Sequence, residues 1–400
     1  MPLYKNGKLI ITYYKDILTA IIVDNKGKAI QIFPDVKDSE SLIGNIYIGR
    51  VNNIVKNINS AFIEYLPGCM GYYHLSEDAD PLFAVPGRKN GPLRKGDVLL
   101  VQVCKDSVKS KEPVLSCNIT LTGKYIVLMP DSPGLRFSSK FKNSAKKNEI
   151  EKRFKEHEYK DGFILRTNSQ FAEVDDIFEE IDFYSRLWLM IRDCGSYQKV
   201  LTQVYKSPPS YLIGIRDGYD DIIDEIVTDK EDVYEDIHDY MDKYQPADLK
   251  KLKFHRGNFP LSTIYNFEKQ INDALQKKVW LKSGGYLVIE PTEALVSIDV
   301  NTGRYISEKN AEDEFLKINL EAAKEIARQI LLRNLSGIII VDFINMKSQA
   351  YKNMLMDYMK NLLEFDPLQT TVVDMTKLNL VEITRKKGRK PLYELLRSNV

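Results

Sequence analysis

The stretch GGYLVIEPTEALVSIDVNTGRY, residues 284–305, decides the fold together with GIIIVDF at residues 337–343. Each is an apolar, β-branched run that leads to an acidic residue, Asp299 in the first and Asp342 in the second. Side chains alternate between the two faces of a strand, so Asp299 and Asn301 point to the side opposite Val300. We therefore expect a carboxylate and an amide to lie beside each other on a polar strand face.

A helix is expected between these two strands. Its apolar residues recur at spacings of four and three, as on one face of a helix: Leu316, Leu320, Ala323, Ala327 and Ile330. Gly337 follows as the expected stop signal. A strand–helix–strand unit makes its strands parallel neighbours, and open α/β sheets bind ligands at the edge where such strands end. Asp299, Asn301 and Asp342 then indicate a divalent-metal site; alternatively, each Asp is only a turn or cap residue.

Composition is that of an ordinary globular protein. The 400 residues are 44% hydrophobic and 28% charged, and the net charge is +1, so any polyanion site must be local. This length predicts about two to four domains. Four cysteines without CxxC spacing favour a reducing compartment. Without a signal-peptide pattern or a run of roughly 18 apolar residues, a cytoplasmic protein without a membrane segment is expected.

The first third of the chain predicts β structure. Alternating apolar runs around residues 25–27 indicate a hairpin, which needs further strands to be stable. Short strands punctuated by glycine between residues 39 and 116 indicate a small closed barrel of the OB type. Phe62 and Tyr72, with Lys105 and Lys111, would suit a platform that stacks bases and meets phosphates. Phe62 could instead belong to the barrel core.

The remaining segments alternate between strands and helices. Strands are expected at residues 124–130, 162–169, 211–217 and 370–384. Residues 136–160 are basic and form either a solvated helix or an RNA-facing arm. Residues 217–243 are acidic and predict an amphipathic helix, and another helix is expected at 351–365. Arg166 and Thr167 end a strand, where they could grip a phosphate. The segment RKKGRK at 385–390 is strongly basic.

Over nearly its whole length the chain strongly resembles the catalytic half of the ribonuclease E/G family of bacterial endoribonucleases. The most specific pieces are KVWLKSGGYLVIEPTEALVSIDVNTGR, NLEAAKEIARQILLRNL and GIIIVDFINM. The resemblance implies an α+β / α/β multidomain protein. An RNase H-like subdomain (1–38 and 211–273) would hold an inserted S1-type OB-fold (39–116) and a 5′-sensor subdomain (117–210). A DNase I-like catalytic subdomain (274–400) would follow.

The resemblance also implies roles for particular residues. Asp299 and Asp342 match the pair that holds the catalytic Mg²⁺, with Mn²⁺ as an alternative, and Asn301 matches the amide that contacts the scissile phosphate. Positions that match RNA-gripping residues of the barrel are Phe62, Tyr72 and Lys111, with Lys105 nearby in the basic group. Positions that match the 5′-monophosphate pocket are Gly123, Val127, Arg166 and Thr167.

The expected activity is Mg²⁺-dependent hydrolysis of single-stranded, A/U-rich RNA to 5′-phosphate and 3′-hydroxyl ends, in rRNA and tRNA processing and mRNA decay. Ser139 stands where the family has a second arginine of the 5′ pocket, so either the preference for a 5′-monophosphate is weaker or the adjacent Lys140 compensates. The family's zinc-binding CPxC element is missing from the 400 residues, so no zinc site is expected, and both a homodimer and a monomer remain open. The alternative is a non-catalytic RNA-binding or scaffold protein that retains the fold.

Overall fold

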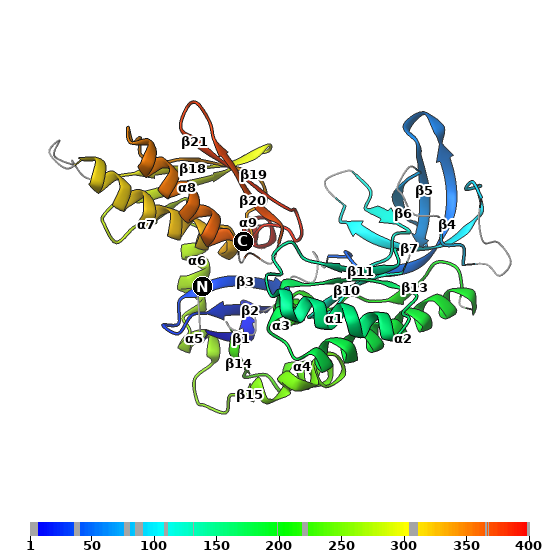
Figure 1. Ribbon diagram of the computed structural model, residues 1–400. Coiled ribbons are helices and arrows are strands. Elements are labelled where there is room, and N and C mark those ends of the chain that lie inside the picture. Colours follow the sequence, from blue (N-terminus) through cyan, green and yellow to red (C-terminus); the bar gives the residue numbers. More distant parts are fainter. Residues whose placement is uncertain are drawn as a thin grey trace. The chain divides into compact units, whose positions relative to one another are not determined.

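A computed structural model describes residues 7–35, 41–75, 81–84, 91–107, 111–130, 132–197, 199–217, 223–303, 311–364, 366 and 368–397. It is a mixed α and β structure with several sheets, one of which closes into a small barrel (Figure 1). The chain forms two compact units. Residues 1–39 and 210–400 make unit 1, and residues 40–209 make unit 2.

The N-terminal hairpin finds its partners much later in the chain. The first sheet of unit 1 has the order β15 (Leu252–Phe254), β14 (Ile223–Thr228), β1 (Gly7–Tyr14), β2 (Ile17–Val23) and β3 (Ala29–Asp35). The expected hairpin is confirmed, with Gly27 at φ +76° in its turn, and β1 pairs with β14 in parallel. Helices α3 (Ser210–Asp217) and α4 (Glu231–Tyr244) pack against one face. Helices α5 (Leu261–Ile264), α6 (Phe267–Leu275) and α9 (Leu392–Arg397) contribute to the core on the other, and η4 (Pro246–Lys251) precedes β15.

Two predictions in this region are wrong. Residues 211–217 are helix α3 and not a strand, because Tyr211, Leu212 and Ile215 are buried together at a helical spacing. Residues 217–243 are not one amphipathic helix. Ile226 belongs to strand β14 and Val233 to helix α4. The spacing between these two apolar residues fits one helix, but it fits a strand followed by a helix equally well.

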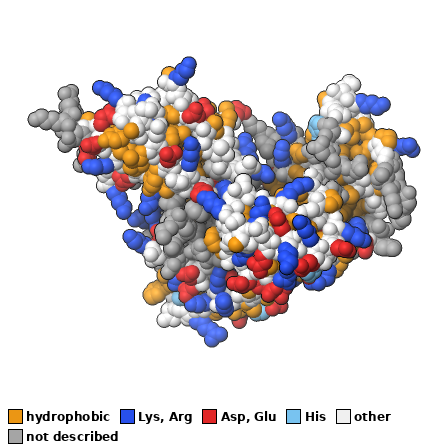
Figure 2. Space-filling model, viewed as in Figure 1, with side chains coloured by type: hydrophobic (Ala, Val, Ile, Leu, Met, Phe, Trp, Pro, Cys, Tyr) orange, Lys and Arg blue, Asp and Glu red, His pale blue; other side chains and the backbone are white. Residues whose placement is uncertain are grey.

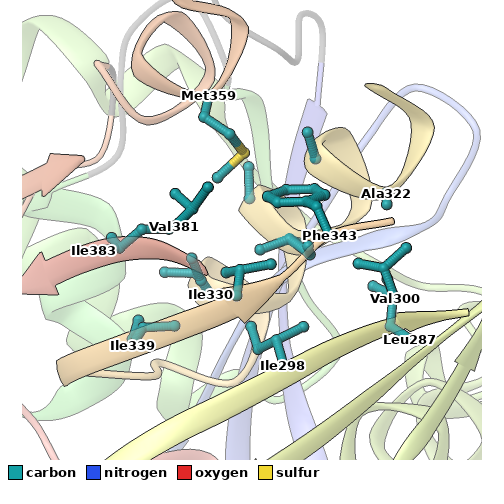
Figure 3. Close-up of a cluster of buried hydrophobic side chains, with 14 of the residues drawn as sticks. Leu287, Ile298, Val300, Ala322, Ile330, Ile339, Phe343, Met359, Val381 and Ile383 are labelled. Carbon is teal, nitrogen blue, oxygen red and sulfur yellow. The ribbon is translucent and has the colours of Figure 1, made fainter. Parts of the chain in front are cut away.

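The second sheet of unit 1 contains the stretches that open the sequence analysis. Its order is β16 (Lys278–Trp280), β17 (Tyr286–Pro291), β18 (Leu295–Asn301), β19 (Gly337–Asp342), β21 (Leu380–Arg385) and β20 (Thr370–Met375). Strands β18 and β19 are parallel neighbours joined through α7 (Ala311–Leu332), as predicted. Helix α7 and α8 (Gln349–Leu363) lie side by side over one sheet face (Figure 1). Figure 3 shows Ile298, Val300 and Ile339 packed beneath them with Ile330 and Phe343.

Two boundaries differ from the predictions. The helix ends at Leu332, Asn334 just beyond it has a left-handed φ of 50°, and Gly337 instead begins β19. Residues 370–384 form a hairpin of β20 and β21 and not one strand. Asn379 turns the chain at φ 64°, and the Thr376 hydroxyl accepts the backbone N–H of Leu380.

Unit 2 contains the barrel and a smaller sheet. The barrel runs β13 (Thr202–Tyr205), β4 (Ile46–Val55), β5 (Ser60–Leu66), β6 (Cys69–His74), β8 (Val114–Ser116) and β7 (Val98–Lys105), and β7 returns to pair with β4. The smaller sheet runs β11 (Gly134–Phe137), β12 (Gly162–Leu165), β10 (Ile126–Met129) and β9 (Leu121–Thr122). Helices α1 (Ser144–Glu156) and α2 (Val174–Tyr197) and the short turns η2 (Lys56–Ile58) and η3 (Thr167–Gln170) complete it.

Helix α1 fits the solvated alternative for residues 136–160. The Asn143 side chain caps it by accepting the backbone N–H of Lys146. Ile150 and Phe154 are its buried residues, and its basic side chains lie outside the core. On the face shown in Figure 2, basic and acidic side chains are interspersed, in keeping with the net charge of +1.

Candidate metal centre and associated polar surfaces

The two acidic strand ends meet. Asp299 of β18 is the direct cross-strand partner of Asp342 of β19, and both side chains are exposed. Asn301 follows two residues later on the same face, and its Nδ2 donates a hydrogen bond of 2.7 Å to Asp299 Oδ2. The structure therefore brings together the carboxylate, amide and carboxylate that the sequence singled out.

The electrostatics of this pair favour a cation. Partial burial raises the pKa of Asp342, and the negative charge of Asp299 raises it further. Two carboxylates side by side repel each other, and a divalent ion between them would remove that repulsion. No group of three or more His, Cys, Asp or Glu side chains gathers for a metal among the described residues. A pair is sufficient for Mg²⁺, which keeps several waters and uses only one or two carboxylates.

Helix α7 fixes the segment that follows Asp342. The fully buried Asn319 donates from Nδ2 to the Ile344 carbonyl at 2.8 Å and accepts the Ile344 N–H at 3.0 Å. Glu312, in the first turn of the same helix, accepts the backbone N–H of Lys347 at 2.9 Å. The sequence did not mark these residues for this role, although a polar Asn at a position that helical spacing places in the core is the available signal.

Close backbone contact fixes the segment after Asn301. Gly303 has φ +70°, and a side chain there would place its Cβ 2.1 Å from the Gly284 carbonyl oxygen. Only glycine fits such a position. Glu321 of α7 accepts the backbone N–H of Lys282 at 2.6 Å and so holds the neighbouring turn. The glycines of the opening stretch therefore let two loops touch beside Asn301.

In unit 2, three predicted RNA-binding residues share one row across the barrel. Phe62 of β5 is the cross-strand partner of Tyr72 of β6. Tyr72 also pairs with Val114 of β8. Val114 lies opposite Lys105 of β7, which completes the row. The Phe62 and Tyr72 rings meet edge to face with centroids 6.1 Å apart. The Tyr72 hydroxyl is held by Ser60 Oγ at 2.5 Å.

The burial pattern separates this row from the barrel core. Ala61 and Ile63 on either side of Phe62 are fully buried, whereas Phe62 is only partly covered, so it does not belong to the core. Tyr73 points inward and is a core residue. Lys111 is exposed, and Lys109 lies outside the described residues.

The predicted phosphate pocket assembles in part at the smaller sheet of unit 2. Arg166 follows β12 and donates through Nη1 to the Gly123 carbonyl at 2.6 Å. The Thr167 hydroxyl lies 3.1 Å from that of Ser138, whose oxygen also accepts the backbone N–H of Lys140 at 3.3 Å. Val127 lies on β10, where it pairs with Ile164 of β12 and Thr122 of β9. Ser138, which the sequence did not single out, is the hydroxyl that faces Thr167.

A buried carboxylate, which the sequence analysis did not identify, holds the backbone of residues 124–126. Glu180 of α2 accepts the backbone N–H groups of Lys124, Tyr125 and Ile126 at 2.7, 2.7 and 3.0 Å. Burial raises the pKa of Glu180 to about 7, although these N–H groups and the nearby Arg166 lower it. Gly123 is required beside it, because a Cβ there would lie 2.6 Å from the Glu180 carboxyl group.

Two arginines of the basic segment 385–390 pack against the protein's own residues. Arg385 is buried and makes two hydrogen bonds to the fully buried Asp366, from Nε at 2.6 Å and from Nη2 at 3.1 Å. Arg389 lies over the Phe33 ring at 4.2 Å, and burial lowers its pKa to about 10. These two arginines therefore fasten the chain to its own core.

Comparison with known proteins identifies relatives of this chain. The model of the ribonuclease E/G family matches residues 120–388. Ribonuclease G of Salmonella typhimurium (strain SL1344) is 31% identical over 365 residues, which cover 89% of this chain and 75% of the relative. Ribonuclease G of Haemophilus influenzae is 29% identical over 388 residues, 94% of this chain and 79% of the relative.

Ribonuclease E relatives are longer than this chain. That of Nostoc sp. (strain PCC 7120) is 32% identical over 365 residues, which cover 88% of this chain but 52% of the relative. Among the described helices, none is both long enough and apolar enough to cross a membrane.

Proposed function

This chain belongs to the ribonuclease E/G family, and on that premise we propose that it is a Mg²⁺-dependent endoribonuclease that cuts single-stranded RNA. The observation that carries the proposal is the pairing of Asp299 with Asp342 across parallel strands, with Asn301 bonded to the first. Cleavage would leave 5′-phosphate and 3′-hydroxyl ends.

The residues present fit a magnesium ion. Asp299 and Asp342 would hold it through carboxylate oxygens, which are the ligands that this hard cation prefers, and Mn²⁺ could take its place. Bound there, the ion would polarise the scissile phosphate and lower the pKa of a water.

The protein's own contribution is positioning. The Asn301 amide has two N–H donors, of which one bonds Asp299 and the second would meet a phosphate oxygen. Asn319 keeps the backbone after Asp342 in place, so the distance between the two carboxylates is fixed before substrate arrives.

The outer row of the barrel supports a preference for single strands. Phe62 and Tyr72 can stack only on bases that are not paired, and Lys105 and Lys111 would meet phosphates beside them. We propose this row, with a preference for A/U-rich segments, as the RNA grip of unit 2.

The Arg166 region supports a 5′-monophosphate sensor. Arg166 is anchored to the Gly123 carbonyl, and a guanidinium group is a charge-assisted donor to phosphate oxygens. Thr167, Ser138 and Lys140 add hydroxyl and ammonium groups next to it. The turn of Gly123, with Val127 beyond it, would form the wall.

The finer assignments belong to the same proposal. The sheet of β1–β3 with β14 and β15 would be the RNase H-like part, the barrel the S1-type OB-fold, and the sheet from β16 to β21 the DNase I-like part. The chain would act in rRNA and tRNA processing and mRNA decay in the cytoplasm, as a monomer or homodimer.

The test is cleavage of a short 5′-monophosphorylated single-stranded RNA with Mg²⁺. Asp299→Asn and Asp342→Asn should each lower kcat by at least a hundredfold, because a neutral amide holds a divalent ion poorly. Asp374→Asn, an exposed carboxylate on β20 of the same sheet, is the matched control and should cut normally.

Mn²⁺ binding followed by electron paramagnetic resonance gives a readout that is independent of turnover. Both site variants should bind Mn²⁺ more weakly than the Asp374→Asn control. Cleavage by both site variants at the control rate would remove the metal assignment. RNA binding without any cleavage by the unmodified chain would instead favour the non-catalytic alternative.

A further inference from the structure

The sheet face that carries Asp299 also carries an exposed aromatic pair. Directly opposed residues in an antiparallel sheet point to the same side, so cross-strand partners can be followed from strand to strand. Asn301 of β18 lies opposite Tyr286 of β17, and Tyr286 lies opposite Trp280 of β16. In the same way, Asp299 lies opposite Val288 of β17, and Val288 lies opposite Lys278 of β16.

The helices do not cover this face. Helices α7 and α8 pack on the other side, where Leu287, Ile289 and Val300 are buried. On the open side Trp280 is 64% exposed, whereas the second tryptophan of the chain, Trp188, is 3% exposed. Leaving a tryptophan ring in water forgoes a large gain from burial, so an exposed ring on a polar sheet face indicates a partner.

The geometry of the cluster suits a flat ligand. The Trp280 and Tyr286 rings are 5.3 Å apart between centroids and inclined at 61°, so they meet edge to face, and Trp280 stays largely accessible to a ligand. The Lys278 ammonium lies 4.0 Å from the Trp280 centroid and 3.6 Å from the Tyr286 centroid. Lys278 makes no ion pair with any residue that the structure describes, so its charge is available.

We propose that Trp280, Tyr286 and Lys278 form a base-stacking site for a nucleotide of single-stranded RNA close to the cleaved bond. Trp280 would stack on the base, Tyr286 would brace the indole, and Lys278 would meet the adjoining phosphate. This inference rests on the proposed function, since it places the same substrate on the same sheet.

The spacing supports RNA as the occupant. Neighbouring strands are about 4.8 Å apart and residues about 3.4 Å, so two strands and two residues separate the Trp280 and Asp299 backbones by about 12 Å. A nucleic-acid strand whose phosphate reaches the two carboxylates can therefore place a nearby base over Trp280.

Tryptophan fluorescence gives a direct test of binding. An unlabelled single-stranded RNA is titrated into the whole protein with EDTA present, so that nothing is cut. Stacking should quench Trp280, and Trp280→Leu should lose the quenching because the buried Trp188 is out of reach. Phe259→Leu removes another exposed aromatic of unit 1, which is 68% exposed, and should keep it.

Abasic substitution locates the stacked base. In RNAs that lack one base at successive positions around the cleavage site, one position should weaken binding to the wild type about tenfold, as expected for one lost stack. That position should have no effect in Trp280→Leu, since the partner ring is already gone. Trp280→Phe should restore part of the sensitivity, which a purely structural role would not do.

Three results would overturn the proposal. Quenching that persists in Trp280→Leu would place the RNA elsewhere, and equal abasic sensitivity in Trp280→Leu and the wild type would show that the ring stacks on nothing. A change of mass in light scattering on Trp280→Leu, with RNA affinity unchanged, would make the surface a protein contact. Failure of the proposed function is distinct, because it appears as undiminished cleavage by Asp342→Asn and leaves the fluorescence test unaffected.

Discussion

At the scale of single residues, the most consequential groups outside the metal centre are buried polar side chains that hold backbone. Asn319 bonds both backbone groups of Ile344, and Glu180 accepts three consecutive N–H groups at residues 124–126. A buried polar group is costly unless it is paired, so these side chains specify one loop conformation each.

Glu180 makes the stability of unit 2 depend on pH. Its pKa rises from the ordinary 4.5 to about 7 on folding. The folded protein thus holds this proton more tightly than the unfolded chain, and the stabilisation is complete below pH 4.5 and is lost as pH rises through about 7. The free energy of unfolding should fall over this range by up to about 3 kcal/mol relative to a variant that cannot titrate.

Urea unfolding of the wild type and of Glu180→Gln between pH 4.5 and 8 measures this difference. Glu179→Gln alters the exposed neighbour on the same helix and should keep the wild-type pH dependence. Parallel curves for the wild type and Glu180→Gln would show that Glu180 does not titrate in this range.

At the scale of elements, function follows the rows in which strands align their side chains. The row from Phe62 through Tyr72 to Lys105 crosses the barrel, and the row from Asn301 through Tyr286 to Trp280 crosses the second sheet of unit 1. Each joins residues far apart in sequence, and register alone makes them neighbours.

Phe62→Ala should weaken binding of single-stranded RNA by about 1–3 kcal/mol while the barrel stays folded. The reason is that Phe62 lies on the outer row, with Ala61 and Ile63 supplying the core at that point. Binding is measured by fluorescence anisotropy and folding by thermal unfolding.

Ile58→Ala is the matched control, because Ile58 is an exposed apolar residue of the same unit, 52% exposed. It should leave the affinity unchanged. A large fall in melting temperature for Phe62→Ala, without a specific loss of affinity, would return Phe62 to the core alternative.

At the scale of the whole molecule, the two units differ in how the chain builds them. Unit 2 is one continuous segment that contains every strand of its two sheets, and the Ser207 N–H donates to Asn45 Oδ1 at 2.8 Å, which ties its two ends together. Unit 1 is discontinuous, since β1 must pair with β14 from beyond residue 222.

A fragment of residues 40–209 should therefore fold and unfold cooperatively, whereas residues 210–400 should lose the sheet that contains β14. Circular dichroism during urea unfolding and hydrogen exchange of each fragment measure this. Because β13 pairs with β4, a fragment ending at residue 116 should be much less stable than one ending at 209. Full protection of β14 amides in the 210–400 fragment would contradict the pairing.

Local pattern determined much of this protein. Apolar alternation and a helical repeat were enough to predict β18, α7 and β19, and parallel pairing then placed Asp299 beside Asp342. The sequence pattern gave wrong predictions at two places. The apolar residues of 211–217 fit either a strand or a helix, and the structure has a helix. At residues 370–384 a short polar turn divides the apolar run into two strands.

Only the tertiary structure decided the rest, because it depends on contacts between distant residues. In the sequence Glu180, Asn319 and Asp366 are ordinary polar residues. Their structural roles come from burial, in which Glu180 and Asn319 bind backbone groups and Asp366 binds the Arg385 side chain. Likewise five of the six residues of RKKGRK are basic in sequence, yet Arg385 is buried against Asp366 and Arg389 is half-buried over the Phe33 ring. The acidic pair could be predicted because local pattern places both carboxylates. The side chains that hold it in place could not, because their role exists only once the chain has packed.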